Sequence, residues 1–383
     1  MPLTADETEL RAWIRLGLEP GLGPTRIRRL LAVFGMPQDI YTASTGNLAR
    51  HLDPALATRL RQAPDEAMQS ALDASLDWLR EPDHHALTLA DPQYPTCLLE
   101  LHDPPPMLFL NGDPSLLHRP AIAIVGARSA TTGGSENAQA FAQYLSGQGW
   151  CIISGLASGI DAAAHEGALN AGPDAGRTIA VLGSGIDIVY PARNRTLAHR
   201  IAQDGLLVSE FPLGARAMPH YFPMRNRIVA ALSRGVLVVE AARQSGSLIT
   251  ARLATELGRE VFAIPGSIHS PLARGCHALI RQGAKLVESG EDILEELRQS
   301  GPSPTAAADT VDRPAPMARQ KPDLAVSGDE HALLEALGHD PVDAGQIQGR
   351  LQWAMARVNA ALAMLELQGM IARQPDGRFQ RLA

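Results

Sequence analysis

The stretch AIAIVGARSATTGG (121–134) decides the fold, because a short β-branched run ends at glycine and leads directly into a helical pattern. Similar runs recur along the chain, most of them ending at or near glycine. They are CIISG (151–155), TIAVLG (178–183), LLVSEF (206–211), GVLVVE (235–240) and EVFAIPG (260–266). Short apolar strands alternating with Ala- and Leu-rich helices indicate βαβ units and a mostly parallel sheet. The sequence therefore predicts an α/β fold whose turns meet at the carboxyl edge of the sheet, where such sheets bind ligands.

Helical patterns precede this sheet in residues 1–80. Apolar residues recur at helical spacing in LRAWIRLGL (10–18) and RIRRLLAVFG (26–35), which predicts amphipathic helices. The turn LGPT (22–25) resembles one half of a helix-hairpin-helix, whose amides contact phosphate, but a simple packing module explains it equally well. With 9 basic and 10 acidic residues, this segment does not favour strong DNA binding.

A linker and a small domain follow the sheet. Residues 299–328 hold five prolines and show no periodicity, which predicts a flexible linker. Three helical patterns and a hairpin around PDG (375–377) predict a winged helix over 329–383. With the sheet domain assigned to 81–298, the chain divides into four segments.

Composition places the chain among ordinary globular proteins. Of 383 residues, 45% are hydrophobic and 20% charged, and no apolar run approaches the ~18 residues of a membrane span. The acidic N-terminal stretch is unlike a secretory signal, and the three scattered cysteines exclude a disulfide framework or a zinc ribbon. We therefore expect a cytoplasmic protein without a metal or cofactor. The net charge of −7 excludes a uniformly basic surface but permits one basic groove.

The first turn after the sheet's opening strand predicts an anion site. Gly126 starts it, Arg128 projects from it and Ser129 adds a hydroxyl. Free amides and the dipole at a helix start favour phosphate. The turn matches neither GxGxxG nor a P-loop, so dinucleotide binding is weakly supported and a P-loop ATPase is excluded. A purely geometric role for the turn is the alternative.

Later turns repeat this pattern of glycine and hydroxyl residues. Their candidate phosphate contacts are Ser154 and Gly155, Gly183 and Ser184, and Ser245, Gly246 and Ser247. So many turns at one edge predict repeated contacts along a groove. Asp161 and His165 share a helix face, but two ligands alone make a weak metal or acid–base site. We interpret Asp161 as a helix cap and His165 as a packed side chain.

The segment 190–234 combines arginines with aromatic rings. From Arg193 to Arg234, seven arginines stand against Asp204 and Glu210 only. The candidates for strand binding here are Arg225, Asn226 and Arg227 for phosphates, and Tyr190, Tyr221 and Phe222 for stacking on bases. Arginines interleaved with rings are what a single-strand binder needs. The alternative is that the rings fill the core and the arginines pair with carboxylates.

Taken together, these blocks resemble the DNA-processing protein A family, also called Smf. The matching blocks are IVGARSATTGG, SGLASGIDAAAH, AVLGSGIDIVYPARN, LVSEFPLG, FPMRNRI, VVEA, SGSLITARLA, VFAIPG and GCHALIRQGAKLVES, in order within about 121–289. The resemblance implies an extended Rossmann-like domain that binds single-stranded DNA, a sterile-alpha-motif-like N-terminal domain and a C-terminal winged helix. It also implies a homodimeric recombination mediator, not a conventional enzyme, that protects incoming DNA in natural transformation and helps to load the RecA recombinase.

The resemblance also assigns roles by position. It puts Arg128 on phosphate, with the glycines, serines and Arg225–Arg227 block named above lining or supporting the same pocket. Two departures stand out: Thr132-Gly133 replaces a Pro-Tyr pair frequent in relatives, and Arg216 stands near a lysine found in some of them.

Two other functions remain open. A nucleotide phosphoribohydrolase uses a similar sheet, but its PGGxGT block is absent here. A transcription factor acting through the winged helix is disfavoured by 5 basic against 7 acidic residues in 329–383.

Overall fold

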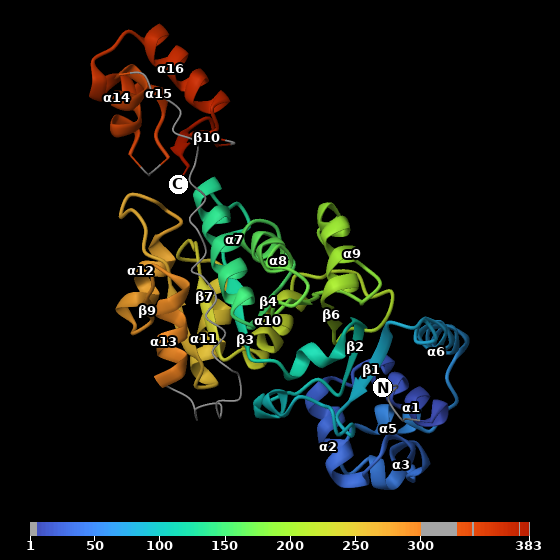
Figure 1. Cartoon of the computed structure of the whole chain (residues 1–383). Coiled ribbons are helices and arrows are strands. Elements are labelled where there is room, and N and C mark those ends of the chain that lie inside the picture. The colour runs from blue at the N-terminus through green and yellow to red at the C-terminus, as the bar shows by residue number, and fades with distance from the viewer. Residues whose placement is uncertain (1–5, 300–327, 339–340, 375, 383) are drawn as a thin grey trace.

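A computed structural model describes residues 6–299, 328–338, 341–374 and 376–382 (Figure 1). The expected linker lies outside the described residues except at its two ends. The described chain forms a helical N-terminal unit, a central sheet domain and a small C-terminal domain. None of its helices has the length and hydropathy of a transmembrane span.

Short helices build the N-terminal unit. They are α1 (Glu7–Leu18), α2 (Pro24–Phe34), α3 (Pro37–Thr42), α4 (Thr45–Leu48), α5 (Pro54–Leu60) and α6 (Glu66–Trp78). The helical spacing has the expected effect, because Leu16, Ile27 and Leu30 meet in one buried core. Trp13 and Leu72 turn the other way and join a cluster with sheet residues, which anchors the unit to the central domain.

The central domain is built on a nine-stranded sheet in the order β1-β2-β6-β5-β4-β3-β7-β8-β9. The strands are β1 (His84–Thr88), β2 (Met107–Gly112), β3 (Ala121–Val125), β4 (Cys151–Ser154), β5 (Thr178–Val181), β6 (Leu206–Ser209), β7 (Gly235–Val238), β8 (Glu260–Ala263) and β9 (Lys285–Leu286). Strands β3 to β8 are the six expected from the sequence, and they are parallel, which confirms the α/β prediction. Three strands were not expected from the sequence: β1 and β2, which pair antiparallel at one edge, and β9 at the other.

Helices cover both faces of the sheet (Figure 1). On one face lie α7 (Thr132–Gly147), α8 (Ile160–Leu169), α9 (Arg195–Asp204) and α13 (Gly290–Gln299). On the other lie α10 (Tyr221–Leu232), α11 (Ser247–Glu256) and α12 (Arg274–Arg281). Three 3-10 helices complete the domain, η1 (Thr96–Glu100), η2 (Pro114–His118) and η3 (Ala192–Asn194). Because β3 to β8 are parallel, their carboxyl ends meet at one edge, which we call the carboxyl rim.

The C-terminal domain is the predicted winged helix. It comprises α14 (Gly328–Leu337), α15 (Ala344–Leu351), α16 (Met355–Leu367) and the hairpin of β10 (Ile371–Arg373) and β11 (Phe379–Arg381). The domain lies at the start of α7 (Figure 1), where Gln374 Nε2 donates to Thr132 Oγ1 at 2.9 Å and the amide of Gly133 donates to Gln380 Oε1 at 3.3 Å. A Cβ at position 133 would lie 2.6 Å from the Gln380 side chain. Gly133, which stands where relatives often have tyrosine, therefore leaves room for this contact.

Candidate nucleic-acid interface

A hollow of about 600 Å³ opens at the carboxyl rim, and we call it the rim pocket. The loops after β3, β4 and β5 and the starts of α10 and α11 form its walls. The expected site residues among its lining are Gly126, Arg128, Tyr190, Phe222, Arg225, Asn226, Ser245, Gly246 and Ser247. The fold therefore brings together side chains that are spread over more than 120 residues of sequence.

Arg128 is the exposed cation of the rim pocket. Within the described ranges it forms no ion pair, and its guanidinium lies 5.2 Å from the centroid of the Phe222 ring. Tyr190, 53% exposed, lies beside that ring with the two centroids 5.8 Å apart. An unpaired guanidinium next to two rings offers a phosphate contact and a stacking surface together.

Arg225 supplies a second, buried positive charge. Its Nη1 donates to the carbonyl oxygens of Gly155 and Val181, and its Nε donates to Asn226 Oδ1 at 3.1 Å. Burial, and to a smaller extent the charge of Arg128, lowers the pKa of Arg225 to about 10, while Asp161 opposes the shift. The group therefore stays protonated at neutral pH and gives the pocket a fixed charge.

Asp161 holds the loop after β4. Its Oδ2 accepts hydrogen bonds from the loop amides of Gly155 and Ala157 at 3.2 and 3.3 Å, so it is not the expected helix cap; the N-cap of α8 is Gly159, without a side-chain cap. Burial raises the pKa of Asp161, and the neighbouring Arg225 opposes the rise. No group of three or more His, Cys, Asp or Glu in the part of the chain that the structure describes could hold a metal ion.

His165 is packed in the core. Thr178 Oγ1 donates to the Ile152 carbonyl at 2.7 Å, so His165 Nδ1 must be the donor in its own 2.7 Å bond to that hydroxyl. Burial lowers the pKa of His165 to about 3, and the side chain is neutral. Neither Asp161 nor His165 is arranged as half of an acid–base pair.

Two expected site glycines support the pocket from behind. A Cβ at Gly155 would collide with the guanidinium of Arg225, and a Cβ at Gly183 would lie 2.9 Å from the Phe222 ring. Their missing side chains let the arginine and the ring reach the pocket. They are spacers and do not line the pocket.

The helix start after β3 is not free for an anion, which corrects the expectation for the first turn. The amide and hydroxyl of Thr131 donate to the two carboxylate oxygens of Glu240 at 2.9 and 2.6 Å. The Gly134 amide donates to Thr131 Oγ1 at 2.9 Å, and Gly133 is held by the winged helix. The Glu240 carboxylate thus takes the place that we expected for phosphate at the start of α7.

The start of α11 also faces the rim pocket, although its first amides donate within the turn, Ser247 to Ser245 Oγ at 3.3 Å and Leu248 to the Ser245 carbonyl oxygen at 3.2 Å. Its N-cap, Gly246, carries no side-chain cap, and the first turn of the helix contains no acidic residue. This end of the helix lines the rim pocket through Ser245, Gly246 and Ser247. Its dipole adds positive potential to that of Arg128 and Arg225.

Several expected site residues lie elsewhere. The hydroxyls of Ser154 and Ser184 are buried and each donates at 2.6 Å, to the carbonyl oxygens of Ile124 and Ile188. Tyr221 stacks on Phe211, with centroids 4.0 Å apart, and it does not line the pocket. Ser129 is exposed beside Arg128 but also lies outside the lining. We therefore correct the expectation of a phosphate contact for the two buried hydroxyls and of a stacking role in the pocket for Tyr221, and Ser129 is not part of the lining.

Arg227 also departs from the expectation. Its guanidinium is buried, donates to Glu210 and lies 3.3 Å from Asp103 Oδ2. Residues two apart on a helix point about 200° apart, so Arg225 and Arg227 cannot share a face of α10. Four residues of α10 line the pocket, and three of them, Phe222, Arg225 and Asn226, follow the i, i+3, i+4 spacing that the sequence already contained; the fourth is Pro223.

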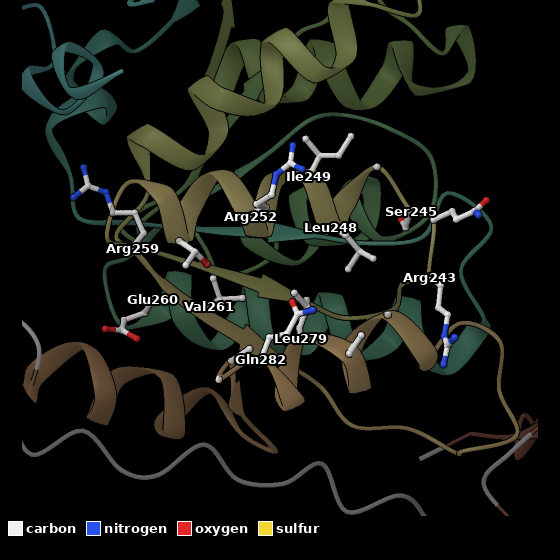
Figure 2. A pocket seen from close by; sticks show the side chains of 17 residues that line it. Arg243, Ser245, Leu248, Ile249, Arg252, Arg259, Glu260, Val261, Leu279 and Gln282 are labelled. Carbon is white, nitrogen blue, oxygen red and sulfur yellow. The ribbon is translucent and has the colours of Figure 1, made fainter. Parts of the chain in front are cut away.

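A larger hollow of about 800 Å³ adjoins the rim pocket, with Ser245, Gly246 and Ile249 in both linings. It lies between α11, α12 and β8, and Figure 2 shows Arg243, Arg252 and Arg259 around it. Leu248 and Leu279 give it an apolar floor (Figure 2). We call it the side hollow.

Comparison with known proteins places the chain in one family. Residues 85–298 match the family described as DNA recombination-mediator protein A, and residues 313–377 match the DprA winged helix domain. Protein Smf of Escherichia coli is 41% identical over 312 residues, covering 81% of this chain and 80% of that protein. The DprA structure from Streptococcus pneumoniae aligns with a TM-score of 0.65 at 39% identity, over 77% of this chain and 99% of that one.

A second solved structure is DNA processing protein A from Helicobacter pylori, described for its single-stranded DNA binding mode. It aligns with a TM-score of 0.51 at 31% identity, over 56% of this chain and 96% of that one. The family match covers more than half of the chain and agrees with the parallel sheet and the winged helix. The chain belongs to the DNA recombination-mediator protein A (DprA/Smf) family.

Proposed function

We propose that the protein binds single-stranded DNA in the rim pocket. The observation that carries this proposal is the unpaired, exposed Arg128 lying against Phe222 and near Tyr190. Phosphate would contact Arg128 and the start of α11, above the fixed charge of Arg225, while an unpaired base stacks on the exposed Tyr190 ring. The single-strand binding attributed to the H. pylori relative supports this assignment.

We further propose that this binding serves recombination mediation in the cytoplasm. On this proposal the protein protects incoming single strands in natural transformation and helps to load RecA on them. Family membership supports the role in DNA processing, and the family resemblance supplies the finer steps.

A loading assay tests the finer steps. On single strands coated with single-strand-binding protein, we expect the wild-type chain to shorten the lag of RecA filament growth and Arg128→Ala to abolish that gain. The measurement is the lag of the RecA ATPase signal. A lag that the wild-type chain does not shorten would contradict the loading role.

Removing the winged helix by truncation near residue 320 should leave single-strand affinity within about twofold of the full chain. Among the described residues, none of this domain lines the rim pocket, and Gln374 and Gln380 contact the start of α7. Fluorescence anisotropy with labelled oligo-dT measures the effect. A large loss on truncation would instead place part of the strand on the winged helix.

We also propose a homodimer, formed where the sheet ends at β9. The side hollow reaches Ala284, next to this short edge strand, and Leu286 on the strand is 44% exposed. A second copy that covers the edge would bury both. Leu286→Glu should therefore give a monomer by light scattering, whereas Leu367→Glu, at an 84% exposed position of α16, should not. A Leu286→Glu dimer as tight as the wild type would overturn this placement.

A further inference from the structure

The N-terminal unit gathers cations around a separate hollow of about 420 Å³, which we call the arginine hollow. Its lining residues are Arg26, Arg29, Leu30, Arg50, His51, Leu52 and Asp53. They come from α2 and from the segment between α4 and α5, so the fold brings two stretches of chain to one place. The charge count of residues 1–80, 9 basic against 10 acidic, gives no sign of this cluster.

Three arginines outnumber the single acid of this hollow, Asp53, and no ion pair joins them to it within the described residues. The guanidinium groups of Arg29 and Arg50 form neither a hydrogen bond nor an ion pair within the described residues, and that of Arg26 donates to the Gly21 carbonyl at 2.8 Å. The carboxylate of Asp53 accepts the Leu56 amide at 2.9 Å as the cap of α5. Like charges held around one hollow repel each other unless an anion joins them.

The start of α2 adds to the same field. Gly23, its N-cap, provides no side-chain hydrogen bond, and the first turn contains no acidic residue. Arg26 sits in that first turn, so the positive end of the helix dipole and the arginines attract the same anion.

The arginine hollow lacks the rings that the rim pocket has. Its one ring, that of His51, is packed edge-on against Phe34, with centroids 5.6 Å apart and planes at 87°. Without a free ring a base has nothing to stack on, whereas a phosphate backbone needs only cations. Duplex DNA presents its phosphates outward and keeps its bases stacked.

We infer that the arginine hollow is a second DNA site, which holds the phosphate backbone of duplex DNA. The inference rests on the proposed function only in taking DNA as the polyanion. The two sites differ in what they bind: the rim pocket, with its rings, binds a single strand, and the arginine hollow binds a duplex. Figure 1 shows α2 at the end of the molecule opposite the winged helix, away from the carboxyl rim.

Charge reversal at two exposed positions tests this inference. The variant carrying Arg29→Glu and Arg50→Glu should bind a short blunt duplex about tenfold more weakly than the wild type. The slope of its log affinity against log salt concentration should be shallower, by the amount expected for the loss of about two phosphate contacts. Its affinity for oligo-dT should stay within about twofold of the wild type, because the rim pocket is intact. Arg128→Ala should show the reverse pattern.

The matched control is Arg80→Glu, an exposed arginine of the same unit that lies outside the hollow and pairs with Asp77 at 2.6 Å. Circular dichroism checks that each variant is folded. Duplex binding by the double variant equal to that of Arg80→Glu would overturn the inference, and so would an equal loss for duplex and oligo-dT. If Arg128→Ala keeps its oligo-dT affinity while the double variant loses duplex, the rim-pocket proposal fails and the arginine hollow stands.

Discussion

Arg128→Ala should weaken binding of oligo-dT by about 10- to 100-fold, because it removes the exposed cation from the rim pocket and with it a charged hydrogen bond to phosphate. The side chain is exposed and forms no ion pair in the described chain. The variant should therefore be as stable as the wild type, with the same midpoint of denaturant unfolding. Affinity is measured by fluorescence anisotropy over a series of salt concentrations. The slope of log affinity against log salt concentration should also become shallower, by the amount expected for the loss of about one phosphate contact.

Arg298→Ala is the matched control. It removes the same charge from α13, where the arginine pairs with Glu291 at 3.0 Å, and it should leave oligo-dT affinity unchanged. If Arg128→Ala bound as tightly as this control, the rim pocket would lose its principal phosphate contact and the proposed function its main support.

Arg227→Ala should have the opposite profile, a large loss of stability without a direct loss of a pocket contact. Its side chain is 7% exposed and that of its partner Glu210 is 4% exposed, so the substitution leaves a carboxylate buried and unpaired. Breaking a buried pair in this way costs about 3–5 kcal/mol of unfolding free energy. Urea denaturation of the wild type and the variant measures the difference.

A second variant separates the causes of that loss. Adding Glu210→Gln to Arg227→Ala removes the stranded charge and should restore part of the lost stability. If Arg227→Ala instead unfolded within about 0.5 kcal/mol of the wild type, the buried pair would not have the structural role that we assign to it.

The regular part of the fold could be predicted because its signals are local. Strands β3 to β8 are recognisable in the sequence as short apolar runs, because they are buried on both faces of the sheet. Each is followed by a helix. β1 and β2 pair antiparallel across an intervening segment that offers no tight hairpin turn, so no local signal joins them. β9 has two residues and exists only through its pairing with β8.

The site was predictable in position and less so in its details. Because the strands are parallel, the turns that follow them meet at one rim, and this position does not depend on the orientation of their side chains. Which side chains face the pocket depends on where a helix begins: once α10 is known to start at Tyr221, spacing alone puts Arg225 on the pocket and Arg227 away from it. The Glu240 contact to Thr131 joins residues 109 positions apart, and no periodicity reports it.

A crystal structure of the protein with a short oligo-dT would test directly whether the rim pocket binds the strand, through the distance from the Arg128 guanidinium to the nearest phosphate oxygen. We predict a hydrogen-bond distance of about 2.7–3.2 Å, with a thymine base against Tyr190 or Phe222. A strand bound on another face, with Arg128 still in solvent, would contradict the account.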